Sequence, residues 1–440
     1  MKPTDRRDSH EKTILVGVIL PDGIHNPEDP LDEIRGLAES AGLVVVGSML
    51  QKRQHADPAA YIGSGKVEEL KELVDAHEAD VVLFDNDLGP AQTRNLERAI
   101  GVKVIDRTEL ILDIFATRAR THEARLQVEL AQLEYAMPRL KRMWTHLSRY
   151  KSGVGMRGPG EKQLEEDRRL ALQRIQDLKA KLAKVQARKE REVAARGEAV
   201  TVSLVGYTNA GKSTLMNALT DAHVYVADQL FATLDTRTRR WAFKGGGFAL
   251  LSDTVGFIRN LPHSLVASFK ATLEEASQAD LLIHVVDASN PEAEKQIEAV
   301  KAVLDELGLG DHPTVLALNK VDQVQDPSYL DVLRSHHDEA AEISAATGDG
   351  LDRLEDKVRE VLNEMAMDVE IRTKVSDGKV LAYLAQHAQI LDRVYRDDDE
   401  VSVFCRLPRR SLGFLREHGV DAHYVQDRRE RDRDLMRETA

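Results

Sequence analysis

The stretch Gly206-Tyr-Thr-Asn-Ala-Gly-Lys-Ser213 decides the fold of the centre of this 440-residue chain. It fits the pattern G-x-x-x-x-G-K-[ST] in full, and it lies between an apolar run, 199–205, and a helix-like segment, 213–219. Glycines at its two ends allow backbone torsions that point successive N–H groups at phosphate oxygens. The lysine neutralises phosphate charge, and the serine hydroxyl is a hard oxygen ligand that suits Mg²⁺. The stretch therefore predicts a phosphate-binding loop (P-loop) in an α/β domain.

A second glycine-lysine turn, Gly63-Ser-Gly-Lys66, resembles this pattern only in part. Ala60 stands where the first glycine is needed, and Val67 stands where the metal-binding hydroxyl is needed. We therefore interpret this turn as a loop that opens a helix, and not as a phosphate site.

The motif D-x-x-G follows the P-loop, at Asp253 and Gly256, directly after the strand-like run 248–252. An acid at a strand end can hold Mg²⁺ through water, and the backbone N–H of a glycine can meet a γ-phosphate. The motif is short and carries little weight alone, but its position after a strand is the one that a phosphate site requires.

Two later motifs predict that the bound base is guanine. Asn319-Lys-Val-Asp322 follows the apolar run 314–318, and its last carboxylate can accept hydrogen bonds from the N1–H and the exocyclic amine of guanine. Adenine has no such donor pair, so a carboxylate at Asp322 favours GTP over ATP. Ser344-Ala345 can place a backbone N–H on the guanine carbonyl. Open α/β sheets bind ligands at the carboxyl ends of their strands, which is where all these motifs fall.

The rest of the chain divides into regions of different character. Before residue 116, β-branched runs at 13–20, 43–50, 81–85 and 102–105 alternate with amphipathic stretches at 66–77 and 91–100. This alternation predicts a parallel sheet covered by helices. We therefore expect an N-terminal α/β domain at 1–116, a helical hairpin at 117–197, a Ras-like GTPase domain at 198–366, and a small α+β domain at 367–440. In the last domain we expect a helix at 380–391, strands at 400–406 and 423–425, and a charged tail.

The hairpin is predicted from apolar residues that repeat at alternating intervals of four and three. These are Leu126, Leu130, Leu133, Met137, Leu140, Trp144 and Leu147, and then Ala171, Ile175, Leu178, Leu182 and Val185. Four glycines and a proline within 153–160 exclude a continuous helix and form the tip. From Arg139 to Arg196 there are 17 Lys/Arg against 7 Asp/Glu, although the whole chain has a net charge of −13. A basic arm on an acidic protein predicts contact with a polyanion.

The composition indicates the cellular compartment in which the protein is expected. The single cysteine, Cys405, excludes an intramolecular disulfide and favours a reducing compartment, in which this thiol is core filler and not a nucleophile. No run approaches the roughly 18 apolar residues of a membrane span, and residues 1–12 lack the apolar stretch of a signal peptide. We therefore expect a cytoplasmic protein with no integral membrane segment.

The chain resembles the HflX family of GTPases over nearly its whole length. The resemblance rests on Leu230-Phe-Ala-Thr-Leu-Asp-Thr-Arg-Thr-Arg239, on Asp253-Thr-Val-Gly-Phe-Ile-Arg-Asn-Leu-Pro-His263 running on to Phe269-Lys-Ala-Thr-Leu-Glu-Glu275, and on the glycine-rich tip before Glu161-Lys-Gln-Leu-Glu165. It implies a Mg²⁺-dependent GTPase that binds the large ribosomal subunit and its RNA and helps to split stalled ribosomes. We expect no DNA partner and a monomer.

The resemblance also supplies the first switch segment, whose threonine binds Mg²⁺. It maps to Thr233, although Thr236 and Thr238 are close, and many members of the family have proline at position 236. A further departure, this time from Ras-like enzymes, is Phe257, which stands where they carry a glutamine that orients the attacking water. A phenylalanine has no donor or acceptor for that task, so either it only packs, or another group positions the water and intrinsic hydrolysis is slow.

These motifs together define the expected nucleotide-binding site. Contacts with GTP or GDP are expected from Gly206, Tyr207, Thr208, Asn209, Ala210, Gly211, Lys212, Ser213, Thr214, Asp253, Gly256, Asn319, Lys320, Asp322, Ser344 and Ala345. Mg²⁺ ligands are expected to be Ser213, Thr233 and Asp253, and the reacting phosphate is expected to be stabilised by Lys212, Thr233 and Gly256.

Two other functions fit parts of the sequence. One is a switch protein whose hairpin binds another protein. Partner binding that is insensitive to salt would favour this function. The other is an ATP-driven enzyme that remodels RNA through the N-terminal domain, where we identify no P-loop.

Overall fold

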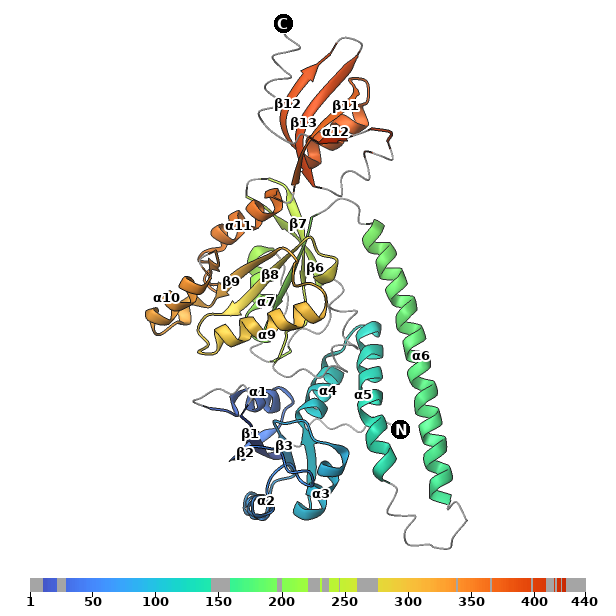
Figure 1. The fold of residues 1–440 in the computed structure, drawn as a ribbon, viewed down its shortest axis with the longest axis vertical. Coiled ribbons are helices and arrows are strands. Elements are labelled where there is room, and N and C mark those ends of the chain that lie inside the picture. Colours follow the sequence, from blue (N-terminus) through green and yellow to red (C-terminus); the bar gives the residue numbers. More distant parts are fainter. Residues whose placement is uncertain are drawn as a thin grey trace.

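The computed structural model describes residues 11–21, 29–143, 159–195, 200–220, 230–231, 237–244, 246–258, 276–337, 339–364, 366–396, 399–408, 415, 418–420 and 422–424. Within this part of the chain, three sheets and a pair of long helices succeed one another along the molecule (Figure 1). This arrangement confirms the predicted fold class.

The N-terminal sheet is parallel, as predicted. Its strands are β1 (Lys12–Ile19), β2 (Val44–Lys52), β3 (Val81–Phe84) and β4 (Lys103–Asp106), in the order β2-β1-β3-β4. Helices α1 (Asp32–Ser40) and α4 (Arg107–Arg118) pack on one face, and α2 (Ser64–His77) and α3 (Pro90–Ile100) pack on the other. The inner strands β1 and β3 are buried on both faces, which explains why they read as continuous apolar runs, whereas the edge strand β2 is partly exposed. Helix α2 begins directly after Gly63, so the second glycine-lysine turn opens a helix.

Helices α5 (His122–Met143) and α6 (Pro159–Ala195) run antiparallel beside the N-terminal sheet (Figure 1). The predicted seam joins them through Leu126, Leu130, Leu133, Met137, Ile175, Leu178 and Leu182. Two ion pairs flank the seam: Arg174 with Glu129 at 2.7 Å, and Lys179 with Glu134 at 2.8 Å. Trp144, Leu147 and the glycine-rich tip lie outside the described residues. The helix pair is therefore an elongated arm with a packed interior.

The central sheet carries the P-loop. Its strands are β5 (Val200–Gly206), β6 (Arg237–Ala242), β7 (Phe248–Asp253), β8 (Leu281–Asp287), β9 (Thr314–Asn319) and β10 (Ala341–Glu342), in the order β10-β9-β8-β5-β7-β6. Only the β6–β7 pair is antiparallel among the pairs of this sheet that the structure describes. Helices α7 (Lys212–Leu219) and α11 (Leu351–Glu364) cover one face, and α9 (Ala293–Glu306) and α10 (Pro327–His336) cover the other. The carboxyl ends of β5, β7, β8, β9 and β10 consequently meet at one edge.

The C-terminal sheet is antiparallel and differs in part from the prediction. Its strands are β11 (Ala366–Lys374), β12 (Gln389–Tyr395), β13 (Glu400–Pro408) and β14 (Ala422–Tyr424), in the order β12-β13-β11-β14, with α12 (Gly378–His387) on one face. The helix predicted at 380–391 was too long: it ends at His387, Ala388 is already extended, and the chain continues as β12. Cys405 is fully buried, and burial raises the pKa of its thiol to about 12, as expected of core filler.

Candidate functional site

The P-loop connects β5 to α7 and has a shape that only glycine allows at two positions. Gly206 has φ +143°, and a Cβ atom there would lie 2.1 Å from the carbonyl oxygen of Val285. Gly211 has φ +93°, and a Cβ atom there would lie 2.3 Å from Nδ2 of Asn319. Both torsions lie in the left-handed region that favours glycine, and a side chain would also displace the neighbouring strands. The two glycines of the motif are therefore explained by backbone shape and close packing.

Lys212 and Ser213 lie where the motif predicts. The Lys212 ammonium is buried and donates to the carbonyl oxygens of Gly206, at 3.0 Å, and Tyr207, at 2.7 Å. The Ser213 hydroxyl donates to Oδ2 of Asp253 over 2.6 Å, and Asp253 is fully buried. The structure thus brings the P-loop and the D-x-x-G motif together, with a cation and two hard oxygen donors at the same edge of the sheet.

Burial changes the protonation of Lys212. Loss of solvent lowers the pKa of its ammonium to about 8, and the neighbouring Asp253 carboxylate offsets only part of this effect. Below about pH 8 the ammonium is charged, and above that pH it loses its proton in the nucleotide-free protein. Polyphosphate would favour the charged form, so nucleotide binding and proton uptake are linked.

We therefore expect GTP to bind with uptake of a proton above pH 8. Between pH 8 and 9 the affinity should fall by up to about tenfold, because the deprotonated lysine must be recharged on binding. Calorimetric titration at pH 8.5 in buffers of different ionisation enthalpy measures the uptake directly. Lys212→Arg, whose guanidinium stays charged, should bind without it, and equal uptake by this variant would assign the proton to another group.

Asn319 joins the base-binding motifs to the P-loop. It is buried, its Nδ2 donates to the carbonyl oxygen of Ala210 over 2.8 Å, and its Oδ1 accepts from the N–H of Ala345 over 2.9 Å. The sequence predicts that Asn319 helps to read the base and that a backbone N–H of Ser344-Ala345 bonds the guanine carbonyl; one candidate for that donor is the Ala345 N–H. In the structure these two groups bond to one another, so the asparagine holds three loops in register.

The other base-binding residues lie around Asn319. Lys320 has a left-handed backbone, with φ +63°, and its ammonium lies 2.7 Å from Oδ2 of Asp287, at the end of β8. Asp322 lies in a short 3₁₀ turn, Val321–Gln323, and its side chain is exposed. Ser344 is fully buried. The carboxylate of Asp322 is thus accessible beside the P-loop edge.

The D-x-x-G segment is bonded directly to the P-loop. A Cβ atom on Gly256 would lie 2.7 Å from Cα of Thr208 and 2.9 Å from Nζ of Lys212, so glycine is required for close approach. The Phe257 N–H donates to Gly206 and its carbonyl accepts from Thr208. The Phe257 side chain is 4% exposed and packs with Val205, Ala276, Ala279 and Leu282. The structure therefore favours the interpretation that Phe257 packs.

The first switch segment is described only at its two ends. Thr233 and Thr236 lie outside the described residues, whereas Thr238 lies in β6 opposite Ser252. Thr238 is thus part of the sheet. The assignment of the Mg²⁺-binding threonine of the switch to Thr233 stays a prediction. Of the remaining P-loop residues, Asn209 has φ +61°, and Oγ1 of Thr208 accepts from the N–H of Phe231 over 2.9 Å.

The sequence did not reveal that the N-terminal domain packs on this site. Phe231 contacts Phe115 of α4 edge-to-face, with ring centroids 4.6 Å apart, and the Leu230 N–H donates to Oγ of Ser40 over 3.1 Å. Val255 and Ile258 belong to the same apolar cluster as the N-terminal helices. Beside this contact is a cavity of about 440 Å³ lined partly by Glu33, Tyr207, Thr208, Asn209 and Asp287. No sequence periodicity indicates these long-range contacts.

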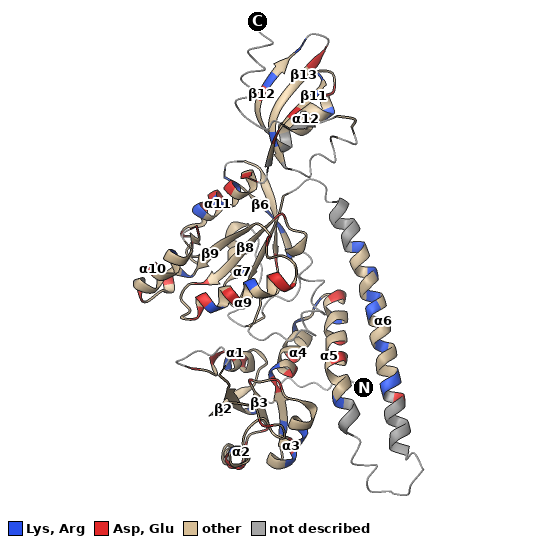
Figure 2. Ribbon diagram, viewed as in Figure 1, with Lys and Arg blue, Asp and Glu red and all other residues tan. Residues whose placement is uncertain are grey.

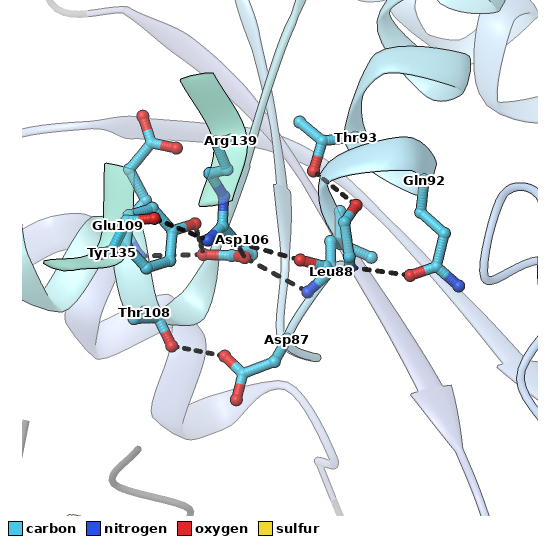
Figure 3. Close-up of polar contacts among 10 residues, drawn as sticks. Asp87, Leu88, Gln92, Thr93, Asp106, Thr108, Glu109, Tyr135 and Arg139 are labelled. Carbon is cyan, nitrogen blue, oxygen red and sulfur yellow. Dashed lines mark hydrogen bonds and ion pairs between the residues drawn. The ribbon is translucent and has the colours of Figure 1, made fainter. Parts of the chain in front are cut away.

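The carboxyl edge of the N-terminal sheet is also polar, but its acid Asp106 is engaged internally (Figure 3). Oδ1 of Asp106 accepts from the Glu109 N–H, which caps α4, and from the Tyr135 hydroxyl at 2.6 Å. Oδ2 accepts from the Leu88 N–H at 3.2 Å and from Arg139 at 2.9 Å. These bonds tie α5 to the N-terminal sheet. Asp106 therefore has a structural role, and it gives no support to an ATP site in this domain.

Three family models match consecutive parts of the chain: "GTP-binding GTPase N-terminal" at residues 28–116, "GTP-binding GTPase Middle Region" at 118–196 and "50S ribosome-binding GTPase" at 201–320. With the P-loop and its sheet, they define a P-loop GTPase, an enzyme that hydrolyses GTP. GTPase HflX of Escherichia coli is 46% identical over 92% of this chain and 95% of that protein. GTPase HflX of Magnetococcus marinus is 46% identical over 90% of this chain and 92% of that protein. The chain belongs to the HflX family of GTPases.

A GTP-binding protein of Sulfolobus solfataricus in complex with GDP aligns over 80% of this chain and 98% of that chain, at 25% identity and a TM-score of 0.42. Among the described residues, no helix is long and apolar enough to cross a membrane.

Proposed function

We propose that this GTPase uses Mg²⁺, associates with the large ribosomal subunit through ribosomal RNA, and acts in splitting or rescue of stalled ribosomes as a cytoplasmic monomer without a DNA partner. The match to the ribosome-binding GTPase model supports ribosome association, and the basic arm supports contact with RNA. We also propose the domain limits 1–116, 117–197, 198–366 and 367–440.

The residues at the P-loop edge divide the chemistry of GTP hydrolysis among them. The backbone N–H groups of the P-loop cradle the phosphates, and the Lys212 ammonium neutralises charge that develops on the reacting phosphate. The Ser213 hydroxyl and the Asp253 carboxylate, 2.6 Å apart, fit a Mg²⁺ site together with Thr233. The ion would supply further charge neutralisation. Gly256 places its N–H beside Lys212, where it can bond the γ-phosphate.

Asp322 selects the base, and Asn319 holds the loops around the base pocket in place. Because Asn319 bonds both Ala210 and Ala345, the base pocket and the P-loop keep a fixed separation, as recognition of one rigid nucleotide requires. Phe257 offers no hydrogen bond to water, and its side chain is in the core. We therefore propose that a backbone group, a second water or the ribosome positions the attacking water, and that turnover is slow without the ribosome.

The observation that carries the ribosomal part of the proposal is the charge of the arm. Figure 2 shows several blue Lys and Arg positions along the ribbon of α6, whereas red Asp and Glu positions are spread over the neighbouring α5 and the GTPase helices. Within the described part of α6, the exposed basic residues include Arg168, Arg169, Lys179, Lys181 and Lys184. Because α6 packs on α5 through one narrow seam, its outer face is open to a polyanion such as RNA.

Reversing charge on this face should weaken ribosome binding. We expect Arg168→Glu with Arg169→Glu to lower affinity for the large subunit by about tenfold or more and to reduce the salt slope by roughly 1 to 2, because fewer counterions are released. Co-sedimentation at several salt concentrations, with a non-hydrolysable GTP analogue, measures both quantities.

A matched control is Lys71→Glu with Arg98→Glu, which makes the same change of charge on exposed residues of α2 and α3. It should bind ribosomes like the unmodified protein, and both variants should keep their GTP affinity. If the α6 variant binds with an unchanged salt slope, the arm is not the RNA contact. Salt-insensitive binding of another protein by the arm would instead favour a switch with a protein partner.

A further inference from the structure

The P-loop is tied to the N-terminal domain by the side chain of its second residue. The Tyr207 hydroxyl lies 2.6 Å from Oε1 of Glu33, which is in the first turn of α1. We propose that Glu33 is a positioning residue of the GTPase site: by holding Tyr207, it keeps the P-loop in the conformation that binds nucleotide. The contact joins residues 174 positions apart in the chain, so it belongs to the assembled fold and not to the P-loop motif.

Glu33 is itself held by a buried cation. The side chain of Arg107 is 2% exposed; its Nη2 lies 2.9 Å from Oε1 of Glu33, and its Nη1 lies 2.6 Å from Oδ1 of Asp85. Burial alone would lower the pKa of Arg107, but the two carboxylates outweigh it and raise the pKa, so the guanidinium stays charged. Its single charge is shared between Glu33 and Asp85, so it offsets part of the negative charge of Glu33 and holds this side chain beside Tyr207.

The backbone of Tyr207 lies at the centre of the P-loop hydrogen bonds. Its carbonyl oxygen accepts from the Lys212 ammonium, and the residues on either side of it bond the backbone of Phe257. Tyr207 is thus held from one direction by the D-x-x-G segment and from the other by the N-terminal domain. The observed loop already has Lys212 and Asn319 in place, so fixing it lowers the ordering cost of nucleotide binding.

Tyr207→Phe removes only the hydroxyl and tests the proposal. We expect the Kd for GDP and the Kd for GTP to rise alike, each by about fivefold, which is the scale of one lost hydrogen bond. The ratio of the two Kd values should stay unchanged, because the lost bond holds the P-loop as a whole and not the γ-phosphate. Fluorescent-nucleotide titration of the full-length protein with GDP and with a non-hydrolysable GTP analogue measures the two Kd values.

Variants of Glu33 distinguish positioning from a purely structural role. Glu33→Gln keeps an acceptor oxygen for Tyr207 and should retain most of the affinity, whereas Glu33→Leu should lose at least as much as Tyr207→Phe, because it also breaks the ion pair with Arg107. The double variant Glu33→Leu with Tyr207→Phe should lose no more affinity than Glu33→Leu alone, since that variant already lacks the bond to Tyr207. Asp32→Asn is the matched control, because Asp32 neighbours Glu33 and lines the same cavity without a bond to the P-loop among the described residues.

Two results would overturn the proposal. One is unchanged affinity for both nucleotides in Tyr207→Phe and Glu33→Leu, even if their unfolding temperatures fall. The other is a loss confined to GTP, which would connect Tyr207 to the γ-phosphate and the switches instead of to the P-loop as a whole.

Discussion

Asp322→Asn is expected to lose GTP and gain xanthosine triphosphate. The carboxylate of Asp322 accepts from both donors of guanine, and an amide cannot accept from both, so we expect a loss of about 3 kcal/mol or more, which is over a hundredfold in affinity. Xanthine has a carbonyl where guanine has its amine, and the amide N–H of asparagine can donate to it. Competition between the two triphosphates for the purified variant measures the exchange.

The matched control for this exchange is Asp326→Asn. Asp326 caps α10, and its carboxylate accepts from the Ser328 N–H, so its loss should affect α10 and not base choice. An Asp322→Asn protein that binds GTP as tightly as the unmodified protein would contradict the assignment of Asp322 to the base.

Lys212→Ala is expected to abolish measurable GTP hydrolysis. The ammonium is the buried cation of the P-loop, and removal of one preorganised donor at a developing charge typically lowers the rate by about 10²- to 10³-fold, with a further loss from weaker phosphate binding. Phosphate release under saturating Mg²⁺ and GTP measures the effect. Circular dichroism should show that the fold persists, because the side chain bonds only loop carbonyls in the part of the chain that the structure describes.

Lys244→Ala is the control for lysine removal. Lys244 is exposed and pairs with Asp352 in the first turn of α11, and neither residue belongs to the P-loop or to the other nucleotide motifs. Its loss should therefore leave hydrolysis unchanged. Turnover within tenfold of the unmodified protein in Lys212→Ala would contradict a direct role for the lysine.

The GTPase fold was predictable because its determinants are local. The P-loop glycines carry unusual torsions that the pattern itself encodes, and each strand before a motif is a short apolar run bounded by that motif. The N-terminal sheet was equally clear, because strands buried on both faces alternate with amphipathic helices.

The C-terminal sheet and the domain contact were harder to predict. The apolar residues of 380–391 fit a helix, and the antiparallel pairing of β12 with β13 shows that the chain has become a strand by Gln389. The contact of Tyr207 with Glu33, and that of Phe231 with Phe115, join segments far apart in the chain. Such contacts depend on how domains assemble, which a single sequence does not express through periodicity or spacing.

The length of α6 has a mechanical consequence. The helix has 37 residues, or about 55 Å at 1.5 Å per residue, and only residues 196–199 separate it from β5, the strand that ends in the P-loop. A rigid rod of this length converts a rotation of about 5° at its base into a displacement of about 5 Å at its far end. A rotation of α6 about its C-terminal end would therefore be magnified at its N-terminal end, and it would have to carry α5, which packs along α6 and is bonded to the N-terminal sheet.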